Sequence, residues 1–67
     1  MNIKLNGKTY DTQNARTVDA LLEELEDFQK EGVAVAVDET VVPKKQWQEF
    51  ELKEGHSVEI IKAVQGG

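Results

Sequence analysis

A single amphipathic helix is the feature that most limits what this chain can fold into. Apolar residues recur between positions 18 and 28 at the i, i+3, i+4, i+7 spacing of one helical face. Thr17 is the predicted N-cap, and Gly32 is the predicted stop, because glycine takes the left-handed conformation that often ends a helix. The face consists of Val18, Leu21, Leu22, Leu25 and Phe28. One helix covers only one face of a sheet, so the other face must meet water or a partner.

An alternating segment and a two-residue turn predict a β-hairpin at the start of the chain. Residues 1–5 alternate apolar and polar side chains, which is typical of a half-buried strand. Asn6-Gly7 follows, and this pair suits a type I′ turn because both central residues of that turn need a positive φ. Residues 8–10 then return as the second strand of the hairpin.

A second hairpin is predicted after the helix. The Val-Ala-Val-Ala-Val segment at 33–37 is a predicted central strand, with its valines on one face and its alanines on the other. Asp38-Glu39 turns the chain into a strand at 40–42, and Pro43 ends that strand because it lacks a donor N–H. Glu39 is a poor residue for a positive φ, so a turn of another type or a bulge is expected there.

The last predicted strand, residues 58–64, leads to a tail at 65–67 that has nothing to bury and is expected to be flexible. The hairpin, the helix crossover and the further strands give the order β-β-α-β-(β)-β. This order predicts an α+β fold of the ubiquitin-like β-grasp type, in which a mixed sheet of roughly four to five strands packs on one helix. Residues 1–67 are expected to form one such domain, because a chain of this length supports a single core.

Charge and composition disfavour several classes of protein. The 8 Lys and Arg residues against 13 Asp and Glu residues give a net charge of −5. That charge disfavours nucleic acids and anionic membranes as partners and favours a basic protein surface. The absence of Cys removes disulfides, thiolate metal ligands and a Cys nucleophile. The apolar run at 33–37 is too short to cross a bilayer, and residues 1–4 begin no signal peptide, so a cytoplasmic location is expected.

The residue types that usually carry catalysis form no convincing site. His56 and Ser57 are adjacent, so in an extended segment their side chains point to opposite sides and cannot pair. The chain has no phosphate-binding glycine loop, so no bound nucleotide is expected. The acidic residues of the helix predict a solvated face rather than a metal site, and within it Glu26 and Lys30 have the spacing of an ion pair. We therefore expect a chain that is no enzyme by itself and binds no metal or cofactor.

The C-terminal Gly66-Gly67 pair is the strongest candidate for a functional motif. Residues without a Cβ make the thinnest possible chain, and Gln65 to Gly67 can extend about 10 Å from the last strand. Such a tail can enter a narrow channel in another enzyme and present the Gly67 carboxylate there. Attack of that carboxylate on the α-phosphate of ATP would give an acyl-adenylate, from which a sulfur or nitrogen nucleophile displaces AMP.

Several longer segments, together with the Gly-Gly end, carry a resemblance to a known family. They are residues 1–7, 17–22, 33–43 and 52–64, with Trp47. They resemble the ThiS family, the sulfur carrier proteins of thiamine biosynthesis, over essentially the whole chain. The family commonly has Asn-Gly at the turn where this chain has Asp38-Glu39.

The resemblance implies a sequence of reactions at the chain end. A ubiquitin-activating-like enzyme would adenylate Gly67 with ATP, and sulfur from a cysteine desulfurase persulfide would replace AMP. The resulting Gly67 thiocarboxylate would donate sulfur to thiazole synthase, while Gly66 clears its path and Gln65 completes the tail. The chain itself is then a carrier, expected to be monomeric alone.

A partner-binding face is predicted on the side of the sheet away from the helix. If Val35 and Ile60 point to the helix, residues of the opposite parity line the other face. These are Ala34, Ala36, Ile61 and Ala63. The alternative is that Ile61 is a second core position beside a bulge.

Other functions stay open at the level of sequence. The same carrier chemistry could serve molybdopterin assembly or an amino-acid sulfur route, because fold and tail do not separate these pathways. A ubiquitin-like modifier that joins its C-terminus to target lysines is a further alternative. The last is an interaction domain with an idle tail.

Overall fold

The computed structural model describes residues 1–26 and 30–62 of the chain. Phe28, Ala63, Gln65, Gly66 and Gly67 therefore lie outside the described residues. The strands are β1 (Asn2–Leu5), β2 (Lys8–Asp11), β3 (Val33–Val37), β4 (Thr40–Val42) and β5 (Ser57–Lys62). The helices are α1 (Val18–Leu25) and the short 3₁₀ helices η1 (Lys30–Gly32) and η2 (Lys44–Gln46).

The strands form one five-stranded sheet in the order β2-β1-β5-β3-β4. The β1–β2, β3–β4 and β3–β5 pairs are antiparallel, whereas β1 and β5 run parallel. The parallel pair at the centre of the sheet results from the helix crossover between the two hairpins, because a tight turn cannot connect parallel strands. This arrangement confirms the predicted mixed sheet with one helix.

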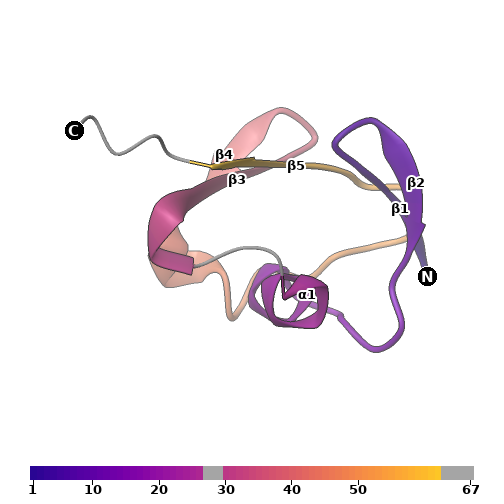
Figure 1. Ribbon diagram of the computed structural model, residues 1–67, viewed down its shortest axis with the longest axis horizontal. Coiled ribbons are helices and arrows are strands. Elements are labelled where there is room, and N and C mark those ends of the chain that lie inside the picture. The colour runs from indigo at the N-terminus through magenta and orange to yellow at the C-terminus, as the bar shows by residue number, and fades with distance from the viewer. Residues whose placement is uncertain (27–29, 63–67) are drawn as a thin grey trace.

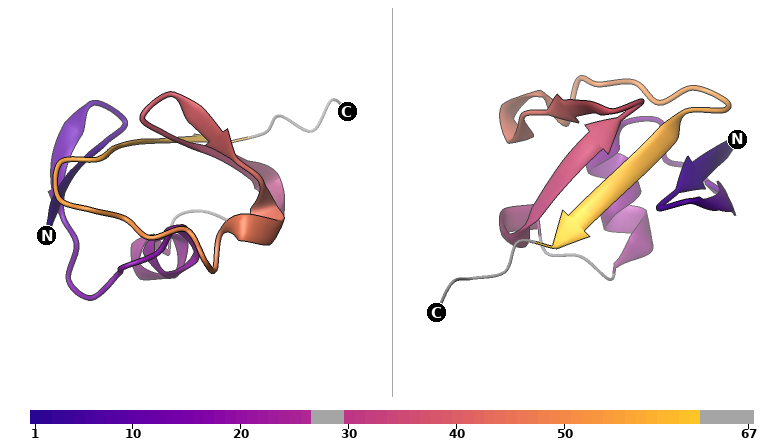
Figure 2. Two further views of the ribbon diagram at one scale, coloured as in Figure 1. Left: turned by 180° about the vertical axis from the view of Figure 1, so that it is seen from behind. Right: turned by 90° about the horizontal axis from the view of Figure 1, so that it is seen from above.

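The helix lies under one face of the sheet, and the core fills the space between them (Figure 1). The view from above shows β5 between β3 and β1, with α1 behind them (Figure 2). The buried apolar residues are Ile3, Ala15, Val18, Leu21, Leu22, Val35, Val37, Val42, Trp47, Leu52, Val58 and Ile60. Trp47 is buried as a packing residue, and its indole N–H donates to the Val42 carbonyl at 2.8 Å.

The helix begins as predicted but ends earlier. The Thr17 hydroxyl accepts a hydrogen bond from the Ala20 N–H at 3.1 Å, as an N-cap does. The prediction that Gly32 stops the helix is wrong. Glu26 takes the left-handed conformation, with φ at 64°, and turns the chain out of the helix directly after Leu25. Gly32 instead ends η1, which leads straight into β3.

The early end of the helix also changes the ion pairs. Because Lys30 lies beyond α1, the predicted pairing with Glu26 by helical spacing is wrong. The Lys30 ammonium contacts the Glu23 carboxylate at 2.8 Å and the Asp19 carboxylate at 2.9 Å. Both carboxylates raise the pKa of Lys30, the Glu23 hydrogen bond most of all.

Both hairpins close with a two-residue turn at positive φ. Asn6 and Gly7 have φ values of 50° and 85°, as their sequence predicts. Asp38 and Glu39 have φ values of 50° and 71°, and Val37 pairs with Thr40 across them. The expectation of a bulge or another turn type at this place is therefore wrong.

Contacts with β5 explain why Asp38-Glu39 adopts this turn. The Asp38 N–H donates to the Ser57 carbonyl at 2.7 Å, and an Asp38 carboxylate oxygen accepts from the Ser57 N–H at 2.9 Å. These two bonds fix the first turn residue against the neighbouring strand. They offset a left-handed conformation that costs about 1–2 kcal/mol for a residue other than glycine.

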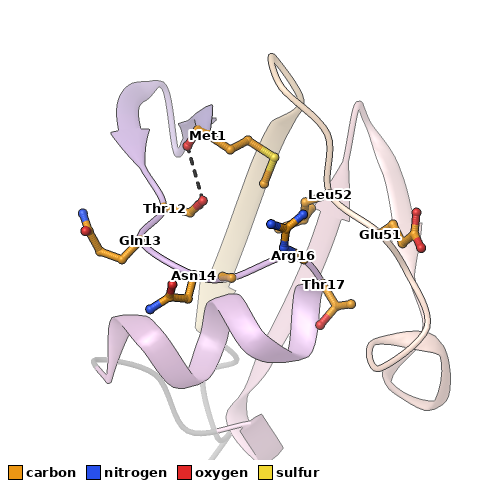
Figure 3. Close-up of a pocket in the computed structure, with 9 residues that line it drawn as sticks. Met1, Thr12, Gln13, Asn14, Arg16, Thr17, Glu51 and Leu52 are labelled. Atoms are coloured by element: carbon orange, nitrogen blue, oxygen red, sulfur yellow. Dashed lines mark hydrogen bonds between the residues drawn. The ribbon is translucent and has the colours of Figure 1, made fainter.

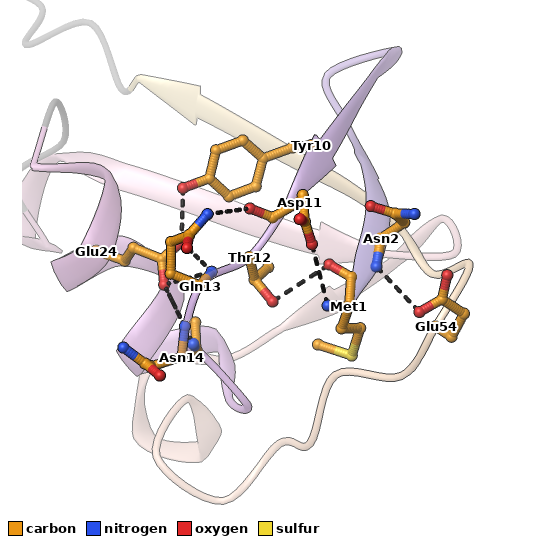
Figure 4. Close-up of polar contacts among 10 residues, drawn as sticks. Met1, Asn2, Tyr10, Asp11, Thr12, Gln13, Asn14, Glu24 and Glu54 are labelled. Carbon is orange, nitrogen blue, oxygen red and sulfur yellow. Dashed lines mark hydrogen bonds and ion pairs between the residues drawn. The ribbon is translucent and has the colours of Figure 1, made fainter.

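The half-buried Glu24 carboxylate of α1 joins the helix to the loop that precedes it (Figure 4). The Glu24 carboxylate accepts a 2.6 Å hydrogen bond from the Tyr10 hydroxyl. It also accepts from the backbone N–H groups of Gln13, Asn14 and Ala15 at 3.0–3.2 Å. The Tyr10 hydroxyl and these N–H groups stabilise the charged form and lower the pKa of Glu24 from 4.5 to about 2. The same hydrogen bond raises the pKa of Tyr10 from 10.0 to about 12.

Replacing Glu24 tests this attachment. Glu24→Gln should lower the free energy of unfolding at pH 7 by about 1–2 kcal/mol, because several hydrogen bonds lose their charged acceptor. Since folding lowers the Glu24 pKa, its contribution is complete above pH 4.5 and disappears as the pH falls towards 2. Urea unfolding followed by circular dichroism across this range should show the two proteins converging in acid.

Tyr10→Phe is the matched control for the alkaline side. Folding raises the Tyr10 pKa, so its contribution is complete below pH 10.0 and is lost as the pH rises towards 12. Tyr10→Phe should remove this alkaline dependence and weaken the acid one, because the Tyr10 hydrogen bond is the largest cause of the lowered Glu24 pKa and only the backbone N–H groups of residues 13–15 then lower it. Parallel pH profiles for the wild type and both variants would contradict the assignment.

Glu39→Gly tests the strained turn. The substitution should raise the free energy of unfolding by about 0.5–1 kcal/mol. Relief of left-handed strain, about 1–2 kcal/mol, exceeds the extra entropy that glycine loses on folding, about 0.5–1 kcal/mol. Thr40→Gly, at the extended neighbouring position, should have the opposite sign in the same thermal unfolding experiment. Destabilisation by both variants would show that the Glu39 side chain supports the turn.

Candidate functional site

Ala34, Ala36 and Ile61, the described residues of the predicted partner-binding face, lie on the face of the sheet that the helix leaves open. Val35 and Ile60 point into the core and are 1% and 5% exposed. Ala34 pairs with Ile61 across β3 and β5, and both residues are exposed. Ala36, the next outward residue of β3, is partly exposed. Ile61 is therefore an outward residue in regular pairing, not a core position beside a bulge.

Val41 belongs to the same surface and was missed by the sequence analysis. It pairs with Ala36 across β3 and β4 and is 68% exposed, while Ile61 is 61% exposed. These are the large apolar side chains that stand exposed in the described residues. The signal was available, because adjacent strand residues point to opposite faces, so Val41 points outward when Val42 is the core residue. We call Ala34, Ala36, Val41 and Ile61 the outer apolar patch.

The strand that leads to the chain end is also the central strand of the sheet. β5 is paired with β1 on one side and with β3 on the other. Ser57, Glu59 and Ile61 alternate outward along it. Glu59 pairs with Ala36, so a carboxylate lies beside the outer apolar patch. The predicted carrier residues Gly66 and Gly67 follow this strand in the sequence and lie outside the described residues.

His56 holds the start of β5 in place. Its Nδ1 accepts the Lys53 N–H at 3.1 Å, and its Nε2 lies 3.8 Å from an Asp38 carboxylate oxygen. Its ring also packs at a tilt against Phe50, with 6.4 Å between the ring centroids. Ser57 contacts Asp38 through its backbone N–H. These contacts give His56 a role in the turn that precedes β5.

A pocket of about 330 Å³ lies between the loop before α1 and residues 51–52 (Figure 3). Arg16 and Thr17 line one side, with Glu51 and Leu52 opposite. Backbone contacts join the two sides: the Leu52 N–H donates to the Arg16 carbonyl at 2.8 Å, and Thr17 and Glu51 form an isolated bridge. The pocket is thus a seam between two segments, and it contains none of the predicted site residues.

Residues 1–26 and 30–62 contain neither a metal-binding cluster nor a membrane-spanning helix. This part of the chain contains no cluster of three or more His, Asp or Glu side chains placed to hold a metal ion. None of its helices is long and apolar enough to cross a membrane.

Comparisons with known proteins match this chain over nearly its whole length. The model of the ThiS family matches residues 3–67. The sulfur carrier protein ThiS of Escherichia coli K12 is 30% identical over 67 residues, which is 100% of each chain.

Two solved structures of a thiamine biosynthesis protein from Geobacter metallireducens share this fold. The crystal structure, of a protein named ThiS, is 30% identical and superposes with a TM-score of 0.86 over 100% of both chains. The solution structure gives a TM-score of 0.79 at 30% identity, over 100% of this chain and 88% of that one. Because the family match, the curated relative and the fold agree over the length of the chain, this protein belongs to the ThiS family.

Proposed function

We propose that this chain is a sulfur carrier of thiamine biosynthesis that carries its sulfur as a thiocarboxylate at Gly67. The observation that carries the proposal is the family match, which extends to Gly67 and so includes the Gly66-Gly67 pair. The Escherichia coli relative, matched over its entire length, is named a sulfur carrier protein. The fold also supports the proposal, because it is shared with a solved structure of a protein named ThiS at a TM-score of 0.86 over 100% of both chains.

The proposed chemistry has two steps at one carbon atom. A Gly67 carboxylate oxygen attacks the α-phosphorus of ATP, and the bond to the β-phosphate breaks, which releases pyrophosphate and leaves an acyl-adenylate. A sulfur nucleophile then attacks the glycyl carbonyl, a C–S bond forms, and AMP leaves with the C–O bond pair. Glycine suits this step because no side chain hinders approach to the carbonyl.

Partner enzymes supply the catalytic groups in this proposal. An adenylating enzyme of the ubiquitin-activating type binds the ATP, and a cysteine desulfurase persulfide provides the sulfur. When the persulfide is the nucleophile, its terminal sulfur first forms an acyl disulfide with Gly67. A thiol then cleaves the S–S bond, which leaves the thiocarboxylate and a new disulfide. Thiazole synthase then takes the sulfur from the thiocarboxylate. The carrier acts as their co-substrate in the cytoplasm and needs no cofactor of its own.

The outer apolar patch is the proposed docking surface for the adenylating enzyme and thiazole synthase. Val41 and Ile61 expose most of their apolar side chains to water, and the alanines between them let a partner approach the sheet closely. Ala63, the fourth residue of the predicted face, lies outside the described residues. The net charge of −5 and the neighbouring Glu59 favour a partner surface with an apolar centre and a basic rim.

Intact mass spectrometry tests the chemistry. The purified chain is incubated with its own adenylating enzyme, MgATP and inorganic sulfide. Its mass should increase by the difference between one sulfur and one oxygen atom, because sulfide replaces AMP at Gly67. Deletion of Gly67 should abolish the increase. No increase in the presence of an active partner would contradict the carrier function, and conjugates with other proteins would favour a ubiquitin-like modifier.

Ile61→Asp tests the docking surface. The substitution places a charge at one of the two large exposed side chains of the outer apolar patch and should raise the KM for the carrier in adenylation about tenfold or more. Thr9→Asp is the control, since Thr9 is exposed on β2, the strand at the opposite edge of the sheet from β4. Both variants should keep the thermal unfolding midpoint of the wild type within a few degrees. Equal KM values for the two variants, or loss of the folded state in Ile61→Asp alone, would contradict the proposal.

A further inference from the structure

Directly after β1, the Asn6 side chain makes hydrogen bonds to β5 that the backbone of a longer strand would make. The parallel pairing of β1 with β5 continues through a hydrogen bond from the Asn6 N–H to the Val58 carbonyl at 2.9 Å. At Asn6 the main chain then leaves the ladder, because Asn6 and Gly7 turn it into β2. Without a further contact, the next N–H and C=O of β5 on this side would have no partner in the sheet.

The Asn6 carboxamide supplies that contact. Its Oδ1 accepts a 2.8 Å hydrogen bond from the Ile60 N–H, and its Nδ2 donates to the Ile60 carbonyl at 3.3 Å. A carboxamide has the same donor and acceptor as a peptide group, so it can take up the pairing that the next residue of a parallel strand would make. Both bonds are partly buried, which limits the competition from water.

The position of Ile60 makes this contact important for the end of β5. β5 has a partner on both sides as far as Val58, but from Ile60 to Lys62 its strand partner in the described part of the chain is β3 alone. Ile61, one of the two large exposed side chains of the outer apolar patch, comes directly after Ile60, and Lys62 is the last residue of the strand. Any opening of the end of β5 therefore displaces Ile61 from its place beside Ala34.

We propose that Asn6 is a positioning residue for the carrier reaction: its carboxamide holds the end of β5, and with it Ile61, in the orientation that the adenylating enzyme binds. This inference rests on the proposed carrier function. Opening of the strand end lowers the population of the binding-competent form, and the apparent affinity for the partner falls by the same fraction. Once the carrier is bound, its strand end is ordered, so the rate of the chemical step is unchanged.

Asn6→Gly separates the side chain from the turn. Glycine at residue 6 accepts a positive φ without strain, so the hairpin keeps its geometry and only the carboxamide is lost. Asn6→Asp is the conservative variant, because its carboxylate can accept from the Ile60 N–H but cannot donate to the Ile60 carbonyl. Asn2→Gly is the matched control, an exposed asparagine on the same strand at a distance from Ile60.

Amide hydrogen exchange measured by NMR tests the structural part. In Asn6→Gly the protection of the Ile60 N–H should fall at least tenfold relative to wild type, and Asn6→Asp should lie between the two. The Val58 N–H should keep its protection in all three variants, because β1 and β5 remain paired there. Unchanged protection of Ile60 in Asn6→Gly, or an equal loss in Asn2→Gly, would overturn the proposal.

Steady-state adenylation by the cognate enzyme tests the functional part. Asn6→Gly should raise the KM for the carrier at least threefold at constant kcat, with partial rescue in Asn6→Asp and wild-type values in Asn2→Gly. An unchanged KM despite lost Ile60 protection would show a merely structural contact and overturn the positioning role. If the wild-type chain is not adenylated at all, the carrier function fails and the positioning role fails with it, while exchange at Ile60 still shows whether Asn6 holds the strand.

Discussion

Burial of one helical face against one sheet face is the constraint on which the rest of this structure depends. Val18, Leu21 and Leu22 are almost completely removed from water beneath the sheet. At roughly 1.5–3 kcal/mol for each large apolar side chain, such contacts are the main source of stability in so small a protein. The valines of β3 turn inward to meet them, and the alternation of the strand then sends its alanines outward. The alternation that buries the valines thus also places the outer apolar patch on the opposite face of the sheet.

The two hairpins hold the central strand in the same way. Each turn begins with a residue at a φ of 50° whose side chain is hydrogen-bonded to the backbone of β5. Asp38 holds Ser57 at the start of the strand, and Asn6 holds Ile60 near its end. In both cases a short polar side chain continues the support after the backbone has turned away. Asn6 and Asp38 thus both adopt a left-handed conformation, and the side chain of each holds the same strand, β5.

Local sequence signals predicted the parts of the fold that depend on local interactions. The Thr17 cap, the Asn6-Gly7 turn and the inward valines of β3 follow from capping, turn chemistry and alternation. The helix end could not be predicted in this way, because the apolar spacing continues past Leu25 and Glu26 carries no preference for a positive φ. Conformations that depend on contacts with distant parts of the chain could not be predicted from local signals either.

The turn at Asp38-Glu39 is the clearest case of this kind. Its conformation is supported by Ser57, which is 19 residues away in the sequence. For the candidate site, parity placed Ala34, Ala36 and Ile61 correctly on the outward face, and the same rule applied to β4 would have added Val41. The roles of Gly67 and of the patch remain predictions, because they depend on partner molecules.

The central place of β5 has a mechanical consequence. A force applied at Lys62 along the axis of this strand would act across its hydrogen bonds to β1 and β3, so these bonds would share the load and fail together. An edge strand peeled from its end would lose its bonds one at a time, at a much lower force. The sheet therefore resists a pull on its central strand more strongly than a pull on either of its edges.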